Sequence, residues 1–264
     1  MAAIVISSVS TKGGTGKTSA CKFLGITKVR EGKKVLIIDI CQNSDIASRL
    51  GFNREDFTLT SYEYLTEQVP FDAVVRHDEE TGIDFLPSSE KIEKYVDYVE
   101  QTVPLKHEEA FARKIKEIAD RYDYIFIDNH PTAGNKMMFF SLYASDIAII
   151  PTTMDMSSAL ATARTIQLID KFQVLNKDIK TMVIPMAVDF TKGFKKYVDE
   201  LKNDFLSLGV DYFSTPVRHS TIITKAGLDN IVLPLENPYM IKVLNDYKEI
   251  SKELELLTPA LQEG

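Results

Sequence analysis

The chain has 264 residues, of which 44% are hydrophobic and 26% charged, and its formal net charge at pH 7 is −7. These values are ordinary for a single globular domain and exclude disordered, collagen-like and coiled-coil chains. No apolar run reaches the roughly 18 residues of a membrane-spanning helix, and the first residues lack the basic start of a signal peptide, so we expect a cytoplasmic protein.

Apolar runs and amphipathic segments alternate along the chain. Buried strands are expected at residues 3–9, 34–40, 82–87, 123–128, 146–151 and 180–188, and a weaker one at 211–217. Helices are expected at residues 17–30, 90–101, 107–121, 157–172, 192–207 and 239–257. This alternation predicts an α/β fold of three layers, with a mostly parallel sheet covered by helices on both faces.

Charge is unevenly distributed. Residues 52–110 hold 15 acidic and 5 basic side chains, a net charge of −10, which leaves +3 on the rest of the chain. The overall acidity argues mildly against nucleic-acid binding, but a basic face outside this segment is compatible with these numbers. Residues 52–80 have the least regular pattern, and we expect them to form an acidic surface excursion within one domain that spans residues 1–264.

The strongest motif lies between the first strand and the first helix. It consists of Lys12, Gly13, Gly14, Thr15, Gly16, Lys17 and Thr18, followed by Ser19. Glycines allow the backbone to turn its N–H groups toward one phosphate, and the helix N-terminus adds a positive dipole end. Lys17 would bind the β- and γ-phosphates and Thr18 would bind Mg²⁺. The motif therefore predicts a P-loop that binds ATP with Mg²⁺, although Thr11 stands where the standard spacing has glycine.

This loop resembles the deviant Walker A motif of the ParA/Soj/MinD ATPases. Later segments resemble that family in the same order: VLIID at 35–39, IDFLPSS at 83–89, YDYIFID at 122–128 and IIP at 149–151. The resemblance implies that Lys12 reaches the nucleotide of a partner subunit, so that ATP joins a homodimer. It also implies that Asp39 orients the attacking water and that Asp128 holds Mg²⁺, which makes Thr18, Asp39 and Asp128 the expected metal-site residues.

Two segments depart from the family pattern. Where the family reads D-x-D-P-Q, this chain has Asp39, Ile40, Cys41, Gln42 and Asn43, and Asn129 and His130 follow Asp128. Both departures flank the expected γ-phosphate position, so they bear on hydrolysis more than on nucleotide binding. The resemblance also places the adenine near Met186, Pro216 and Arg218.

Within this family, the sequence favours the ParA branch. Iron–sulfur relatives need cysteines beyond Cys21 and Cys41, and arsenite-pump relatives repeat the whole unit, which this chain does not. A membrane-bound MinD relative would end in a basic amphipathic helix, whereas residues 239–257 carry three lysines against four acidic side chains. The loop begins too early for a preceding helix-turn-helix domain, so we expect a short ParA-type protein without a membrane partner.

The resemblance implies partition of a plasmid or chromosome: slow ATP hydrolysis, non-specific DNA binding in the ATP state, nucleoid association and stimulation by a ParB-like or other small DNA-binding partner. Candidate DNA contacts are Lys192, Lys195, Lys196, Lys202, Arg218 and Lys225. Two alternatives stay open. One is a P-loop kinase or ligase that acts on a small molecule, and the other is a nucleotide-gated positioning scaffold with little hydrolysis.

Overall fold

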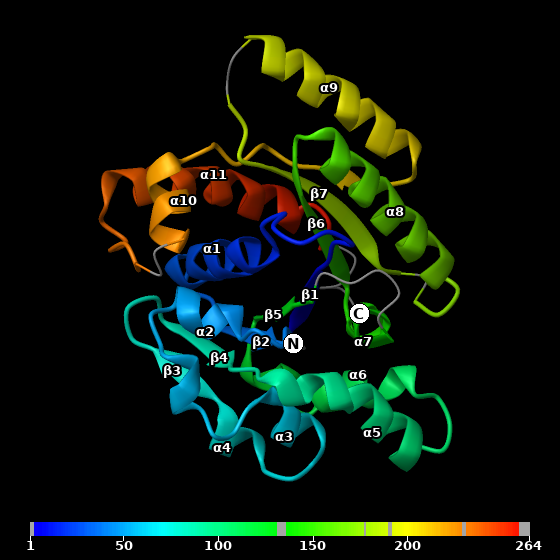
Figure 1. Cartoon of the computed structure of the whole chain (residues 1–264). Helices are drawn as coiled ribbons and strands as arrows, with labels where there is room; N and C mark the ends of the chain where they lie inside the picture. The colour runs from blue at the N-terminus through cyan, green and yellow to red at the C-terminus, as the bar shows by residue number, and fades with distance from the viewer. Residues whose placement is uncertain (1–2, 131–135, 177, 190–191, 229–230, 259–264) are drawn as a thin grey trace.

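The computed structural model describes residues 3–130, 136–176, 178–189, 192–228 and 231–258. Its centre is an eight-stranded sheet with the order β3-β4-β2-β5-β1-β6-β7-β8 (Figure 1). The strands are β1 (Ile4–Ser8), β2 (Val35–Asp39), β3 (Arg76–Asp78), β4 (Ile83–Leu86), β5 (Tyr124–Asp128), β6 (Ile147–Thr153), β7 (Lys180–Met186) and β8 (Tyr212–Phe213). All neighbouring pairs are parallel except β3 with β4, which confirms the mostly parallel sheet.

Helices cover both faces of this sheet. The α-helices are α1 (Lys17–Arg30), α2 (Asp45–Arg49), α3 (Ser61–Leu65), α4 (Phe71–Val74), α5 (Tyr95–Thr102), α6 (Glu108–Lys116), α7 (Lys136–Tyr143), α8 (Met156–Phe172), α9 (Lys192–Ser207), α10 (Thr221–Leu228) and α11 (Pro238–Glu255). Short 3₁₀ turns occur at Arg54–Asp56, Glu90–Lys94 and Ala119–Arg121. The helix expected at 90–101 therefore begins as a 3₁₀ turn, and the one expected at 107–121 ends early.

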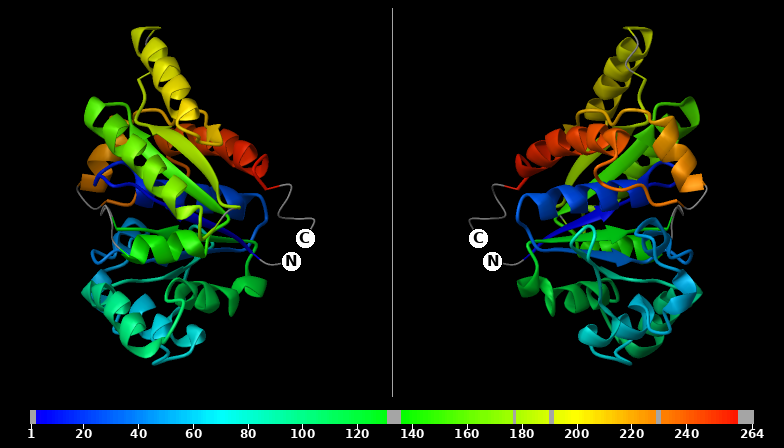
Figure 2. Two further views of the ribbon diagram at one scale, coloured as in Figure 1. Left: turned by 90° about the vertical axis from the view of Figure 1, so that its right-hand side faces the viewer. Right: turned by 90° about the vertical axis from the view of Figure 1, so that its left-hand side faces the viewer.

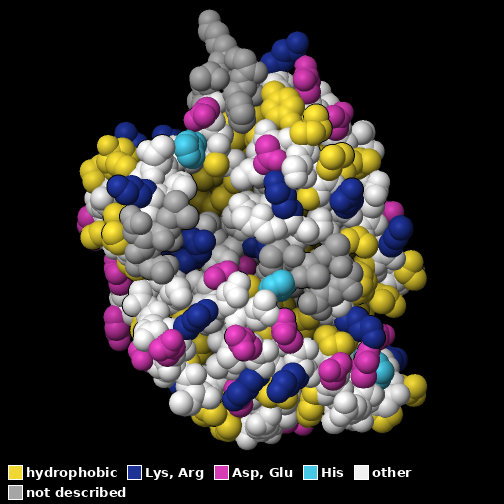
Figure 3. All heavy atoms as spheres, viewed as in Figure 1, with side chains coloured by type: hydrophobic (Ala, Val, Ile, Leu, Met, Phe, Trp, Pro, Cys, Tyr) yellow, Lys and Arg dark blue, Asp and Glu magenta, His cyan; other side chains and the backbone are white. Residues whose placement is uncertain are grey.

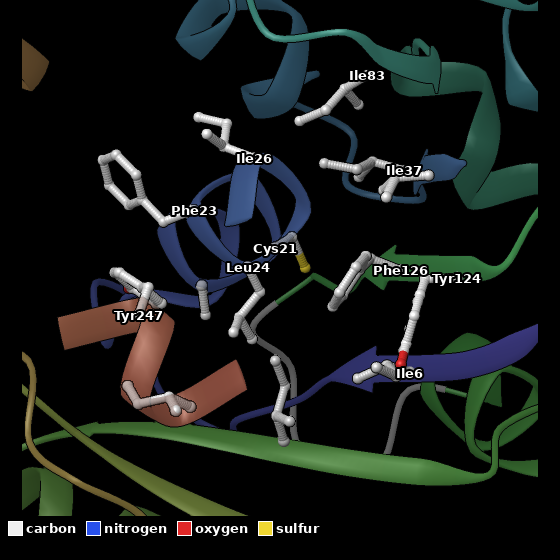
Figure 4. Packing of buried hydrophobic residues seen from close by; sticks show 14 of the residues in the cluster. Ile6, Cys21, Phe23, Leu24, Ile26, Ile37, Ile83, Tyr124, Phe126 and Tyr247 are labelled. Atoms are coloured by element: carbon white, nitrogen blue, oxygen red, sulfur yellow. The ribbon is translucent and has the colours of Figure 1, made fainter. Parts of the chain in front are cut away.

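Two neighbouring helices, α1 and α11, pack together on one face of the sheet. Phe23 of α1 and Tyr247 of α11 have ring centroids 5.2 Å apart, and both belong to the cluster that contains Ile6 and Phe126 of the sheet (Figure 4). The alternate residues of the same strands, such as Val5 and Ile125, pack with the helices of the other face. The central strands are buried on both sides, which is why they appear as continuous apolar runs in the sequence.

The segment 52–80 differs from the expected surface excursion. It forms α3, α4 and the edge strand β3, and its Tyr64, Leu65, Phe71 and Val74 side chains are buried in the core. Helices of four or five residues are too short to show a helical period, so the pattern gave no signal for them. The weak strand expected at 211–217 is reduced to the two residues of β8, followed by an isolated bridge between Val188 and Arg218.

Candidate phosphate-binding site

A cavity of about 600 Å³ opens beside the loop that follows β1. The phosphate loop and the first turn of α1 form one wall. The other walls come from the start of α2, the residue after β5, the segment after β7, residues 217–220, α10 and α11. This is the edge at which the parallel strands end, where open α/β sheets bind their ligands. Figure 3 shows a recess near the middle of this face, with acidic and basic side chains in view.

The phosphate loop depends on two glycines with left-handed backbone. Gly14 has φ +73° and Gly16 has φ +102°, and a Cβ at Gly16 would lie 2.7 Å from Met186 Cε. Gly16 is also the N-cap residue of α1, and no side chain there accepts a hydrogen bond from the helix. The first N–H groups of α1 are therefore available to an anion.

Lys17 is the buried cation of the loop. Its side chain extends back along the loop, with Nζ 3.4 Å from the carbonyl oxygen of Lys12. Only 6% of the residue is exposed, and burial lowers the pKa of its ammonium while the carboxylate of Asp128 opposes that shift. A desolvated cation next to this loop favours an anionic ligand, because charge interactions are stronger where water is excluded.

Asp39 and Asp128 end neighbouring strands and are fully buried. Asp39 accepts hydrogen bonds from the backbone N–H groups of Cys41 at 2.8 Å and Ile46 at 3.2 Å. Among the residues that the structure describes, no group forms a hydrogen bond with either carboxylate oxygen of Asp128. Burial raises the pKa of Asp39 well above its usual range, and it raises the pKa of Asp128 to about 6 against the opposing effects of Thr18 and Lys17.

These two buried oxygens of Asp128 fit a divalent cation. The structure brings Thr18 and Asp128 together as expected, while Asp39 faces backbone donors. Within the described residues, no group of three or more acidic, histidine or cysteine side chains could hold a metal alone. Mg²⁺ usually takes one or two protein oxygens and completes its shell with water and phosphate, so Thr18 and Asp128 would be sufficient protein ligands.

Lys12 is held by the start of α8. Its Nζ lies 3.1 Å from Asp155 Oδ1 and 2.8 Å from Ser158 Oγ. Asp155 is also the N-cap of α8 and accepts a hydrogen bond from the backbone N–H of Ser158. Hydrogen bonds from Ser158 and Thr153, more than the ammonium of Lys12, keep the pKa of Asp155 below its usual range. The pair is partly exposed, with 34% of the Lys12 side chain accessible.

The residues that depart from the family pattern also lie here. Cys41 lines the cavity with Sγ 3.9 Å from Asp45 Oδ2, and burial raises its pKa to about 12, so the group is a protonated thiol. Asn129 lines the cavity as well and is 2% exposed. His130 is half-buried, and the proline after it lies outside the described residues.

Only two of the three residues expected to contact the adenine lie at this cavity. Met186 and Arg218 line the cavity, whereas Pro216 does not. The guanidinium of Arg218 forms two hydrogen bonds with the buried carboxylate of Asp246, at 2.6 and 2.7 Å. Sequence reasoning missed the wall formed by α10, including Ile223 and Thr224, because no motif marks that helix.

Of the candidate DNA contacts whose side chains the structure describes, Arg218 lines this cavity and the others do not. Lys195, Lys196 and Lys202 are exposed on α9, which projects from the body of the molecule, and Lys225 is exposed on α10 (Figure 2). Lys196 also lies 3.7 Å from Glu200. Lys192 begins α9, but its side chain is outside the described part of the structure.

The described helices include none with the length and apolarity needed to cross a membrane.

Comparisons with known proteins agree with this geometry. Residues 3–181 match the family described as an AAA domain, AAA_31. A ParA family protein of Mycoplasma genitalium is 24% identical over 268 residues, which cover 95% of this chain and 97% of that protein. The chromosome-partitioning ATPase Soj of Treponema pallidum is 33% identical over 130 residues, or 48% of each chain.

Among solved structures, cobyrinic acid a,c-diamide synthase from Mycobacterium smegmatis with bound ADP and magnesium matches with a TM-score of 0.78. It is 18% identical, and the match covers 96% of this chain and 94% of that one. At this identity, the likeness shows a shared fold.

Proposed function

Because the chain belongs to the AAA_31 family of AAA domains, and within it to the ParA/Soj/MinD ATPases, we propose that it is an ATPase that partitions DNA through ATP-dependent dimerisation. The single observation that carries the proposal is the arrangement of the two lysines of the phosphate loop: Lys17 lines the cavity, whereas Lys12 turns to the start of α8. Lys17 is buried inside the loop, whereas Lys12 is partly exposed at its rim. This difference supports a role for Lys17 at the nucleotide of its own subunit and a role for Lys12 at the nucleotide of a partner.

ATP occupies the cavity with its phosphates on the loop. Lys17 and the free N–H groups of α1 bind the phosphates, and Thr18 and Asp128 hold Mg²⁺. Mg²⁺ supplies positive charge that offsets the charge of the phosphates and of the two buried carboxylates. Asp39 ends the strand beside Asp128 and orients the water that attacks the terminal phosphate. The support for these roles is the position of each residue at the sheet edge.

Dimerisation places Lys12 against the phosphates of the partner subunit. To reach them, its ammonium leaves Asp155 and Ser158, a partly exposed pair that costs little to break. A second cation on the phosphates offsets charge that develops during hydrolysis.

The ATP-bound dimer binds DNA without sequence preference through the exposed lysines of α9 and α10, and a DNA-bound partner protein stimulates its hydrolysis. The dimer doubles the number of these lysines on one assembly, and each phosphate contact contributes to a salt-dependent affinity. Because Arg218 is already paired with Asp246, we expect Lys195 and Lys202 to contribute more than Arg218.

The first test separates nucleotide binding from dimerisation. Lys17→Ala is expected to lose nucleotide binding, whereas Lys12→Ala is expected to bind the ATP analogue ATPγS normally but remain a monomer. Light scattering during size exclusion, with ATPγS, ADP or no nucleotide, measures both. A wild-type protein that stays monomeric when saturated with ATPγS contradicts the proposal, and so does a Lys12→Ala variant that dimerises and hydrolyses ATP normally.

The second test concerns DNA. The protein is expected to retard duplex DNA with ATPγS but not with ADP, and the slope of log affinity against log salt should fall by about 2 for Lys202→Ala, about 1 for each subunit of the dimer. An equal affinity for DNA with ATPγS, with ADP and without nucleotide would rule out nucleotide-dependent DNA binding. An ATPase assay with DNA and the product of the neighbouring gene distinguishes the partition role from a scaffold, which would barely hydrolyse ATP under any of these conditions.

A small-molecule ligase is the second candidate, favoured by the fold shared with cobyrinic acid a,c-diamide synthase. Such an enzyme would release phosphate only when its acceptor is present. Phosphate release that rises with DNA and a partner protein, without any small-molecule acceptor, excludes it.

A further inference from the structure

Asn129 carries a buried amide at the phosphate cavity. Neither the family motif nor the proposed function assigns a role to this side chain. It directly follows Asp128 at the end of β5 and lines the same cavity as the phosphate loop, with 2% of its surface exposed. A buried amide is costly unless its donors and acceptor are satisfied, so its orientation shows which of its atoms remain available.

Two contacts orient this amide. Its Oδ1 lies 2.7 Å from Ser141 Oγ, and its Nδ2 lies 3.4 Å from the carbonyl oxygen of Ile127. With the amide reversed, two carbonyl oxygens would face each other near Ile127, so the hydroxyl of Ser141 donates to Oδ1. The amide nitrogen therefore has one hydrogen in a long contact and a second without an acceptor in these contacts.

Ser141 is itself fixed by hydroxyl groups that connect α7 to the sheet. Ser145 Oγ donates to the carbonyl oxygen of Ser141 at 2.7 Å and lies 2.8 Å from Ser7 Oγ of β1. All three serines are at most 3% exposed. Ser145 contacts the backbone of Ser141 and not its hydroxyl, so these contacts hold the end of α7 against β1, while the hydroxyl of Ser141 itself aims the amide.

We propose that the Asn129 amide donates an N–H hydrogen bond to the terminal phosphate of a bound nucleoside triphosphate, and that Ser141 is the positioning residue that aims it. The inference rests on the proposed function. The loop and α1 surround the inner phosphates, whereas Asn129 comes from the end of a different strand. A neutral donor is also suited to a place beside two buried carboxylates, where an additional carboxylate would repel the phosphate.

The proposal predicts a selective loss of affinity. Asn129→Ala is expected to weaken ATPγS binding about tenfold, or about 1.4 kcal/mol, because it loses a hydrogen bond to a charged group, while ADP binding stays within about twofold. Removing the amide leaves Ser141 satisfied, because its Oγ lies 2.8 Å from the carbonyl oxygen of Met138. The variant should therefore fold, which a thermal melt checks.

Ser141→Ala is expected to show the same selectivity with a smaller loss, about threefold, because the amide remains but is no longer aimed. Ser145→Ala is the control: it removes a hydroxyl just after the same helix that contacts the carbonyl oxygen of Ser141 but not the amide, and its ratio of ATPγS to ADP affinity should equal that of the wild type. Titration calorimetry of the full chain with each nucleotide and Mg²⁺ measures all of these ratios.

Three results would overturn the inference: a wild-type affinity ratio for Asn129→Ala, an equal loss for both nucleotides, or a selective loss in Ser145→Ala as large as that in Ser141→Ala. In each of these cases the proposed function is not contradicted, provided that the wild-type protein binds both nucleotides. A wild-type protein that binds neither nucleotide would contradict both the proposed function and this inference.

Discussion

Asp39 and Asp128 are register partners at the ends of β2 and β5, and both are completely buried, yet their surroundings differ. Both oxygens of Asp39 accept backbone hydrogen bonds, from Cys41 and Ile46. The oxygens of Asp128 have no such donors. Without a bound cation, burial raises the pKa of both carboxyls, and the carboxylate of Asp128 raises that of Asp39 further.

The raised pKa of Asp128 predicts a specific pH dependence of stability. Burial raises the pKa of Asp128 to about 6 in the folded state, so between about pH 4 and 6 the unfolded chain loses its proton before the folded protein does. The contribution of Asp128 to the free energy of unfolding then falls as pH rises through this window and levels off above it. Asp128→Asn removes the effect, so the variant is expected to be more stable than the wild type at pH 7, by at most about 3 kcal/mol.

Urea unfolding of the nucleotide-free protein, at pH values from about 4 to 8, measures the difference between the two proteins. Asp199→Asn on the exposed surface of α9 is the control and should follow the wild type at every pH. A difference between Asp128→Asn and the wild type that does not change with pH would contradict the prediction.

The sequence was sufficient to place the phosphate loop, because its signal is local: a buried strand, glycines and a lysine, then an amphipathic helix. The helix expected at 17–30 is α1 with the same bounds, and Asp39 and Asp128 end strands as expected. Parallel strands that end at one edge bring such residues together without further information.

The features of the site that the sequence did not predict depend on contacts between residues far apart in the chain. Lys12 and Asp155 are 143 positions apart, and nothing in the local pattern relates them. The hydroxyl of Ser141 that orients Asn129 lies inside an apolar helix, where a serine carries no signal of its own. Arg218 was expected to be available to nucleotide or DNA, and its pairing with Asp246 depends on how α11 packs beside β7 and the segment that follows β8.

The contact between Gly16 and Met186 predicts a difference between two glycine substitutions. Gly14→Ala meets no atom within 4 Å and should cost only backbone strain, about 1–2 kcal/mol. Gly16→Ala adds a clash with Met186, whose sulfur contacts the Tyr247 hydroxyl, so it should cost more. Denaturant unfolding measures both. In a Met186→Ala background the cost of Gly16→Ala should fall toward that of Gly14→Ala, and an unchanged cost would show that the clash is not its cause.

The ion pair between Lys12 and Asp155 predicts that a single conservative change strengthens the dimer. Asp155→Asn retains an N-cap side chain that accepts from Ser158, so α8 and the melting temperature should be preserved. The change removes the negative charge that holds Lys12 in its own subunit. If Lys12 acts across the dimer, the dissociation constant of the ATPγS-bound dimer should fall by up to about fivefold for each of its two pairs, the range expected for a partly exposed pair. Sedimentation velocity over a range of protein concentrations measures this constant, and high salt should reduce the difference between variant and wild type. An equal or weaker dimer in Asp155→Asn would mean that Asp155 does not compete for Lys12.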